Sequence, residues 1–298
     1  MKVLLAVDPS SGSQSVVSEA AARPWPTGTA ICVLSIVDSA RLEGLPQLIE
    51  DAKRAAQVLT EAATDKLEGP GRQVFSDIQM GNPKHAIDDF ARDWQSDLVM
   101  VGSRGLGSFS RFFLGSVAQA VLRTAPCSVE IVRPTPLGEP ASSGALKILL
   151  ATDGSKYSEI AATSVADRPW PAGSQIKVIS VRDLLDLENP TNAFSPCPVY
   201  PESLLSEILN DSRQRAEEAV SRARNILNSK GMKVCEGQYF PVGDARAVLL
   251  DEAHAWGADL IVLGSHGRHG FDRFALGSVS ESVALHAHCS VEIIRGGR

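Results

Sequence analysis

The sequence predicts an α/β fold made of two tandem, doubly wound, five-stranded parallel sheets, and three observations support this prediction. Short apolar runs rich in β-branched residues alternate with stretches of helical period. This pattern is expected for strands buried on both faces and for the helices that cover them. A glycine-rich stretch of fifteen residues occurs twice, at 102–116 and 264–278. Other paired segments repeat with it, so the chain is a duplication of one domain.

Five runs in the first half are typical of strands. Four of them are short and almost continuously apolar, as in a parallel sheet covered on both faces, and the third alternates apolar with polar residues. In chain order, the expected strands are 2–7, 30–37, 73–79, 97–101 and 128–132.

The stretches between these runs predict four helices. Serines after Asp8 are typical N-caps for the first helix, and Gly81-Asn82-Pro83 caps the third. The second helix has apolar residues near a period of 3.6, and the fourth follows the glycine-rich stretch. In chain order, the expected helices are 9–22, 46–67, 84–94 and 117–124.

The second half repeats this order with one insertion. The Arg-Pro-Trp-Pro segments that begin at Arg23 and Arg168 lie 145 positions apart, whereas the glycine-rich stretches lie 162 apart. The difference places a 17-residue insertion after the second strand of the second half, around 186–201. We expect one domain at 1–134, a Pro-, Gly- and Ser-rich linker at 135–145, and a second domain at 146–298.

Composition and charge narrow the class of protein. The net charge of -6 over 298 residues argues against a surface for nucleic acid or anionic membrane. Five scattered cysteines without a CxxC pair indicate no disulfide framework. The apolar run 3–7 is too short for a signal peptide, and no stretch approaches transmembrane length. We therefore expect a soluble cytoplasmic protein without nucleic-acid or membrane partners.

The repeated glycines and two aspartates predict an anion site. Doubly wound sheets bind ligands beyond the carboxyl ends of their strands, where the strand order reverses, here between the first and fourth strands. A glycine-rich loop that leads into a helix N-terminus presents free N–H groups to phosphate, although such glycines also simply shape turns. Asp8 and Asp153 follow the first strand of each half and face these loops. Either carboxylate could take a ribose hydroxyl or Mg²⁺, or act as a helix N-cap, a role that Ser10 and Ser155 could fill instead.

These motifs resemble the tandem form of the universal stress protein family, over almost the whole of both halves. The family's ATP-binding signature, Gly-2x-Gly-9x-Gly-Ser/Thr, is matched in both glycine-rich stretches, and the family's aspartate after the first strand and glycine before the third helix are also matched. The resemblance implies a Rossmann-like, adenine nucleotide alpha-hydrolase-like fold that binds ATP with Mg²⁺ in each half. The implied metal ligands are Asp8 and Asp153. The nucleotide-binding residues it implies are Asp8, Ile36, Gly102, Gly105, Gly115, Ser116 and Val117 in the first half, and Asp153, Val181, Gly264, Gly267, Gly277, Ser278 and Val279 in the second.

The resemblance also implies pairing through the fifth strands. The apolar segments 129–132 and 291–294 would be exposed edge strands unless they were covered. Two fused domains could pair within the chain, or two chains could assemble as a homodimer.

The chain departs from the family's pattern at a few positions. Arg104 stands where the second half has His266, the commoner family residue, and Ala6 and Ala151 stand where the family often has proline. Neither change removes a group that donates a hydrogen bond to phosphate. The difference between Arg104 and His266 leaves open that only one half binds a nucleotide. The insertion at 186–201 is consistent with a lid, a partner surface or a disordered loop.

Several other residues have more than one interpretation. His266 with His269, or His286 with His288 and Cys289, resemble zinc-ligand spacing, but neither set has a counterpart in the first half. Trp25 and Trp170 are typical of packing residues at a turn. Arg111 and Arg273 occupy the same place in both glycine-rich stretches and either reach phosphate or lie in solvent.

Three functions remain open on the sequence. The first is a regulatory protein of the stress response whose conformation or assembly responds to ATP. The second is a slow Mg²⁺-dependent ATPase or phosphotransferase; no repeated His, Glu or Lys base lies beside the glycine loops, so an enzyme is the weaker hypothesis. The third is an interaction module that holds something other than ATP.

Overall fold

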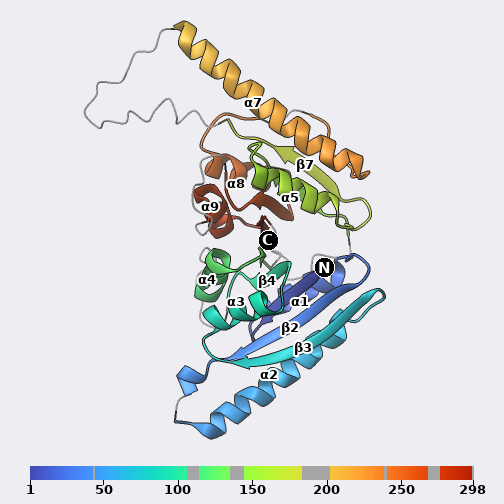
Figure 1. Ribbon diagram of the computed structural model, residues 1–298, viewed down its shortest axis with the longest axis vertical. Coiled ribbons are helices and arrows are strands. Elements are labelled where there is room, and N and C mark those ends of the chain that lie inside the picture. The colour runs from blue at the N-terminus through green and yellow to red at the C-terminus, as the bar shows by residue number, and fades with distance from the viewer. Residues whose placement is uncertain are drawn as a thin grey trace, which may run out of the picture.

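The computed structural model consists of one open α/β sheet with helices on both faces (Figure 1). The structure describes residues 1–42, 44–105, 114–134, 144–182, 202–237, 240–267 and 276–296. The first half contains β1 (Lys2–Val7), α1 (Ser11–Ala22), β2 (Thr29–Val37), a 3-10 turn (Ser39–Leu42), α2 (Pro46–Leu67), β3 (Arg72–Met80), α3 (Pro83–Asp93), β4 (Leu98–Gly102), α4 (Ser116–Thr124) and β5 (Ser128–Val132). The second half contains β6 (Lys147–Ala151), α5 (Lys156–Ala166), β7 (Gln175–Ile179), α7 (Glu202–Ser229), α8 (Ala245–Trp256), β8 (Leu260–Gly264), α9 (Ser278–His286) and β9 (Ser290–Ile294).

The strands form a single nine-stranded sheet in the order β3-β2-β1-β4-β5-β9-β8-β6-β7. Neighbouring strands within each half are parallel, and β5 pairs with β9 in antiparallel register. The α/β class with parallel strands is as predicted, but the two expected sheets are joined into one. The two fifth strands therefore pair within the chain, which is one of the two arrangements that the sequence left open. We call this β5–β9 pair the seam.

The expectation of five strands in each half is wrong for the second half. Among its described residues the third strand is reduced to two isolated bridges, Ile176 with Val234 and Arg182 with Val242. Between the bridges Gly237 has a φ of +112°, and Pro241 has no N–H to donate. Both features interrupt a strand ladder, so β7 is left as the last strand of this edge.

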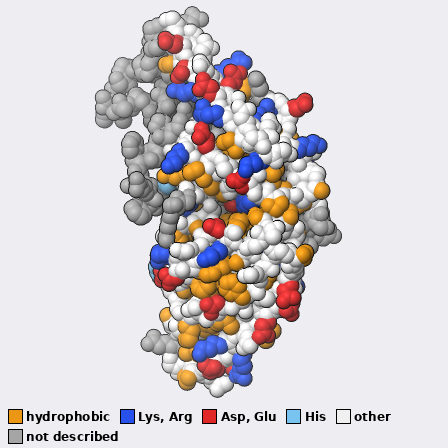
Figure 2. Space-filling model, turned by 45° about the vertical axis from the view of Figure 1, so that its right-hand side comes forward, with side chains coloured by type: hydrophobic (Ala, Val, Ile, Leu, Met, Phe, Trp, Pro, Cys, Tyr) orange, Lys and Arg blue, Asp and Glu red, His pale blue; other side chains and the backbone are white. Residues whose placement is uncertain are grey.

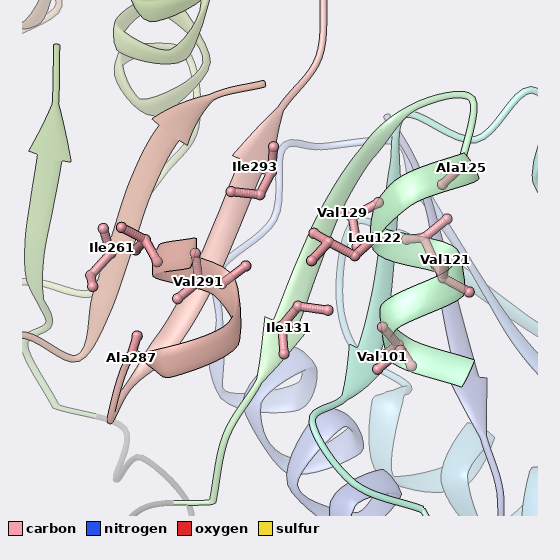
Figure 3. Packing of buried hydrophobic residues seen from close by; sticks show 14 of the residues in the cluster. Val101, Val121, Leu122, Ala125, Val129, Ile131, Ile261, Ala287, Val291 and Ile293 are labelled. Carbon is pink, nitrogen blue, oxygen red and sulfur yellow. The ribbon is translucent and has the colours of Figure 1, made fainter. Parts of the chain in front are cut away.

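On one face of the sheet the apolar core continues across the seam. This core is covered by α3 and α4 in the first half and by α8 and α9 in the second. At its centre Val129 and Ile131 of β5 lie beside Ile293 and Val291 of β9, and all four side chains are fully buried (Figure 3). On the opposite face each half has a core of its own, under α1 and α2 or under α5 and α7.

Between those two separate cores the seam is charged. Glu130 and Glu292 stand directly opposite each other, at 0% and 1% exposure. Like charges in such a pair repel, and buried carboxylates need hydrogen bonds. The Arg23 guanidinium donates to both Glu130 oxygens at 2.7 Å, and the Arg168 guanidinium donates to both Glu292 oxygens at 2.8 Å. Each arginine follows the first helix of its half and therefore holds the carboxylate at the seam.

The tryptophans of the repeated Arg-Pro-Trp-Pro segments pack against these arginines. Trp25 Nε1 donates to Ala20 O at 2.8 Å, and Trp170 Nε1 donates to Val165 O at 2.9 Å. The Trp170 ring centre lies 5.5 Å from the Arg23 guanidinium carbon, so the stacking crosses between the halves. The predicted packing role of both tryptophans is confirmed.

Two further arginines cross the seam at the ends of its strands. Arg133, after β5, donates to Ala284 O at 2.6 Å at the C-terminal end of α9. Arg295, after β9, donates to Leu122 O at 2.6 Å at the C-terminal end of α4. A cation at a helix C-terminus complements the helix dipole. Each of these helices is therefore fastened by an arginine from the opposite half.

None of the helices formed by the described residues is long and apolar enough to cross a membrane. Figure 2 shows acidic, basic and hydrophobic side chains interspersed over one face of the molecule.

Removing one guanidinium from the seam should destabilise the fold strongly. We expect Arg168→Leu to lower the free energy of unfolding by about 3–5 kcal/mol, because it leaves Glu292 buried and unpaired. The double variant Arg168→Leu with Glu292→Leu should regain most of that loss, since it removes the carboxylate together with its partner. Urea unfolding measures both; a double variant as unstable as the single one would contradict this account.

Glu19 gives the seam a pH dependence. The cluster holds three carboxylates, Glu19, Glu130 and Glu292, for two guanidiniums, and burial followed by the charge of Glu130 raises the pKa of Glu19 well above its ordinary value of 4.5. A carboxyl with a raised folded-state pKa contributes stability at low pH and loses it as the pH rises through that pKa. We expect Glu19→Gln to gain stability over the unmodified chain progressively above pH 4.5, whereas the exposed Glu61→Gln should not. Unfolding free energies measured across pH test this; parallel curves for the unmodified chain and Glu19→Gln would contradict it.

Candidate functional site

A cavity of about 910 Å³ opens at the carboxyl ends of β1 and β4 in the first half. This is where the strand order reverses and where the sequence places a ligand. The cavity brings together every site residue predicted for this half, namely Asp8, Ile36, Gly102, Gly105, Gly115, Ser116 and Val117.

Asp8 is held by two serines and does not cap α1. Its Oδ1 accepts hydrogen bonds from the Ser10 hydroxyl, from the Ser10 N–H at 3.1 Å and from the Ser13 hydroxyl at 2.7 Å. Ser10 is the N-cap of α1 and Ser155 is the N-cap of α5, as the sequence allowed. Ser155 N–H likewise donates to Asp153 Oδ1 at 3.0 Å. Ser10 and Ser155 therefore cap the helices, and each also orients the aspartate two positions before it.

The second oxygen of each aspartate faces a glycine of the repeated motif. A Cβ on Gly105 would lie 2.9 Å from Asp8 Oδ2, and a Cβ on Gly267 would lie 2.8 Å from Asp153 Oδ2. No side chain fits at either position without displacing the carboxylate. The glycine of the motif therefore brings bare backbone beside an oriented carboxylate in both halves.

The remaining glycines of the motif have two different roles. A Cβ on Gly102 would lie 2.8 Å from the Gly12 carbonyl carbon in α1, so this glycine permits close strand–helix packing, as Gly264 does against α5. Gly115 and Gly277 are the N-caps of α4 and α9, and neither has a side chain to cap its helix. The first N–H groups of these helices, at Ser116, Val117, Ser278 and Val279, therefore lack a side-chain cap and carry the positive end of the helix dipole.

Ile36 and Val181 lie where the second strand of each half ends. Both are partly buried against the shared core. Gly81 follows β3 with a φ of +144° and donates its N–H to Val37 O at 3.0 Å, and Gly243 has a φ of +149°. These glycines turn the chain towards the third helix of each half beside the strand end.

Part of the cavity wall consists of residues that the sequence motifs do not indicate. Ala52, Ala55 and Ala56 of α2 line it, and so do Asn82 and Lys84 at the start of α3. The small residues on one face of the expected helix 46–67 could have indicated this wall, because alanine leaves room beside a ligand. Arg111, Arg273 and His269 lie outside the described residues, as do most of the linker and the insertion at 186–201.

The comparisons with known proteins agree with this architecture. A model of the Universal stress protein family matches residues 1–133 and 145–295. The chain belongs to this family. It is 29% identical over 248 residues to a universal stress protein of Mycolicibacterium smegmatis, across 83% of this chain and 77% of that relative. It is 32% identical over 216 residues to a universal stress protein of Mycobacterium tuberculosis, across 72% of this chain and 66% of that relative.

A solved structure shows the same fold. The crystal structure of a universal stress protein from Archaeoglobus fulgidus superposes with a TM-score of 0.63 and 21% identity, over 99% of this chain and 96% of that one. The predicted family and α/β fold are thus confirmed.

The two halves of this universal stress protein differ where the first helix meets the glycine loop. In the first half Gly12 packs against the Arg104 carbonyl, and a Cβ there would overlap that oxygen. In the second half Tyr157 stands in place of Gly12, and its ring centre lies 5.0 Å from that of His266, the counterpart of Arg104. Helix and loop therefore pack differently in the two halves.

Among the described residues no three His, Cys, Asp or Glu side chains gather as a protein-only metal site. His288 packs its ring on that of His254, with ring centres 5.1 Å apart, and burial followed by the charge of His254 lowers the pKa of His288. A metal at Asp8 or Asp153 would need further ligands from a bound molecule or water.

The contact at Gly12 gives a stability prediction. We expect Gly12→Ala to destabilise the protein by about 1–3 kcal/mol, because overlap with the Arg104 carbonyl outweighs the gain of about 1 kcal/mol in helix propensity. The exposed neighbour Ser11→Ala is the control and should change stability by less than about 0.5 kcal/mol. Urea unfolding decides; a stabilised Gly12→Ala variant would show that the loop yields freely.

Proposed function

We propose that this protein binds ATP with Mg²⁺ at a site in each half and acts as a regulatory protein of the stress response through nucleotide-dependent conformation or assembly. The observation that carries the proposal is the joint placement of an oriented carboxylate and an uncapped helix N-terminus on one cavity. Phosphate suits the N-terminus of α4, and a divalent cation suits the carboxylate.

Different residues of the site suit different parts of the nucleotide. The N–H groups of Ser116 and Val117 suit the phosphates, and Gly105 lets the backbone approach them. Asp8 Oδ2 suits Mg²⁺ or a ribose hydroxyl, because Oδ1 is already engaged by Ser10 and Ser13. Bound Mg²⁺ would supply positive charge to the phosphate oxygens. The backbone of Ile36, between the apolar wall of α2 and the strand end, suits the adenine.

The second half offers the corresponding groups. Asp153 lies beside Gly267 as Asp8 lies beside Gly105, and α9 begins after Gly277, at Ser278 and Val279, without a side-chain cap. Val181 takes the place of Ile36. These matches support a second site.

A signal from either site has a route to the seam. The helix that begins at the first site, α4, ends at the carbonyls that Arg295 of the other half holds. Similarly, α9 begins at the second site and ends on Arg133. Arg123 of α4 and Glu281 of α9 also form an ion pair of 2.6 Å. Movement of either helix on nucleotide binding would therefore change contacts between the halves.

Regulatory binding fits the cavity better than hydrolysis does. Among its described lining residues the carboxylates are Asp8 and Asp38, and there is no histidine or glutamate to act as a general base. A slow Mg²⁺-dependent ATPase would have to rely on Asp8 and Asp38 both to hold the metal and to activate water.

Nucleotide content tests the proposal directly. Denaturing extraction of freshly purified protein should release two adenine nucleotides per chain, or the empty sites should bind two ATP per chain in calorimetry with Mg²⁺. Gly105→Asp and Gly267→Asp should each remove one, because the new side chain displaces the neighbouring carboxylate and adds negative charge. The exposed Asn228→Asp, in α7, is the control. Protein that releases no nucleotide and binds no added ATP would overturn the proposal.

A further inference from the structure

The described residues of the two sites differ in exposed positive charge, which bears on the nucleotide that each site takes if the proposed function holds. In the first half Arg104 directly precedes Gly105 and lines the cavity. Lys84, at the start of α3, also lines the cavity. No described carboxylate forms an ion pair with either side chain. Both cations are therefore available to an anionic ligand.

The counterpart of Arg104 in the second half is turned into the protein. His266 Nδ1 lies 3.0 Å from the Ser265 hydroxyl, and the ring packs on Tyr157. Its Nε2 is buried and has no hydrogen-bond partner. This position therefore offers the second site no exposed cation.

The counterpart of Lys84 is an arginine whose charge is already paired. Arg246 follows the N-cap Asp244, where the first half has Asn82, and its Nε lies 3.1 Å from both Asp244 oxygens. The hydrogen bonds from Arg246 lower the pKa of Asp244 to about 2, so this carboxylate is ionised at neutral pH. An arginine with its carboxylate partner contributes little net charge.

Two other cations near the second site do not restore the balance. Arg222 of α7 reaches Gly154 O at 3.4 Å, but its guanidinium is also paired with Glu159 at 2.9 Å. Lys156 is exposed and stands in place of Ser11, which does not line the first cavity. Among the described residues, the two positively charged positions of the first site thus have counterparts in the second half that are partly buried or already paired. Arg268 and Arg273 of the second glycine-rich stretch lie outside the described residues.

We propose that the first site selects nucleotides with a polyphosphate chain and that the second site accepts less highly charged nucleotides, such as a monophosphate, with little loss of affinity. The free guanidinium of Arg104 beside the glycine loop can pair with added phosphate groups, and such charge-assisted bonds are stronger than neutral ones. At the second site each added phosphate meets no new free cation among the described residues.

Isolated sites test this inference. Gly267→Asp leaves the first site and Gly105→Asp leaves the second; ATP and AMP are then titrated into each by calorimetry, with Mg²⁺ and separately with a chelator. We expect the ratio of ATP to AMP affinity to be on the order of tenfold higher at the first site, most clearly with the chelator, where protein cations alone face the phosphates. Equal ratios would overturn the inference and leave ATP binding intact. A second site that binds neither nucleotide would also overturn it, and two sites that bind neither would overturn the proposed function itself.

A substitution taken from the chain itself assigns the difference to a residue. In the Gly267→Asp background, Arg104→His should lower ATP affinity about fivefold and AMP affinity less, which moves the ratio towards that of the second site. Arg92→His, on the exposed side of α3 and away from the cavity, is the matched control. Raised salt should shrink the effect of Arg104→His, because screening weakens exposed charges. Equal loss of ATP and AMP affinity would mean that Arg104 supports the loop only and would overturn its role in selection.

Discussion

The antiparallel pairing of β5 with β9 is the constraint on which the rest of the molecule depends. It opposes Glu130 to Glu292 inside the protein, an arrangement that repels unless each carboxylate has a cation of its own. Arg23 and Arg168 meet that requirement, and both follow directly after a first helix whose position they then fix. The repeated Arg-Pro-Trp-Pro segments therefore serve the joint between the halves. The seam is charged on one face of the sheet and apolar on the other. A shift of one residue in the β5–β9 register would exchange these faces, so the two strands are held in one register.

The same pairing sets the relation between the two candidate sites. Because strands are parallel within each half and antiparallel at the seam, their carboxyl ends point to opposite edges of the sheet. A ligand at one candidate site would therefore lie apart from a ligand at the other. The helices α4 and α9 each run from one candidate site to an arginine of the opposite half. Arg133 and Arg295 link each of these helices to the other half, so the two candidate sites are connected through the seam.

Local features were predictable from the sequence, and contacts between distant segments were not. The bounds of β1, α2 and β5 and the gathering of seven residues around one cavity follow from hydrophobic period, glycine spacing and sheet topology. The single sheet does not, because nothing in 129–132 or 291–294 says whether the covering strand belongs to the same chain. The second half loses its third strand at Gly237 and Pro241. The sequence does not predict this loss, because it depends on how this segment pairs with the neighbouring strand. Predicting the cavity wall formed by α2 requires knowing which face of that helix turns towards the cavity.

In this duplicated chain, a substitution at the seam affects residues of both halves, whereas a substitution at one candidate site affects mainly its own half. A change at Glu130 alters the surroundings of Glu292, Arg23 and Arg168 at once, because all four share one buried network. At the sites each half packs against itself. Gly12 leaves room for the Arg104 carbonyl, whereas Tyr157 fills that space and holds His266, so within each half the two positions have to be compatible only with each other. The seam thus restrains both halves together, whereas the contact between the first helix and the glycine loop can differ from one half to the other.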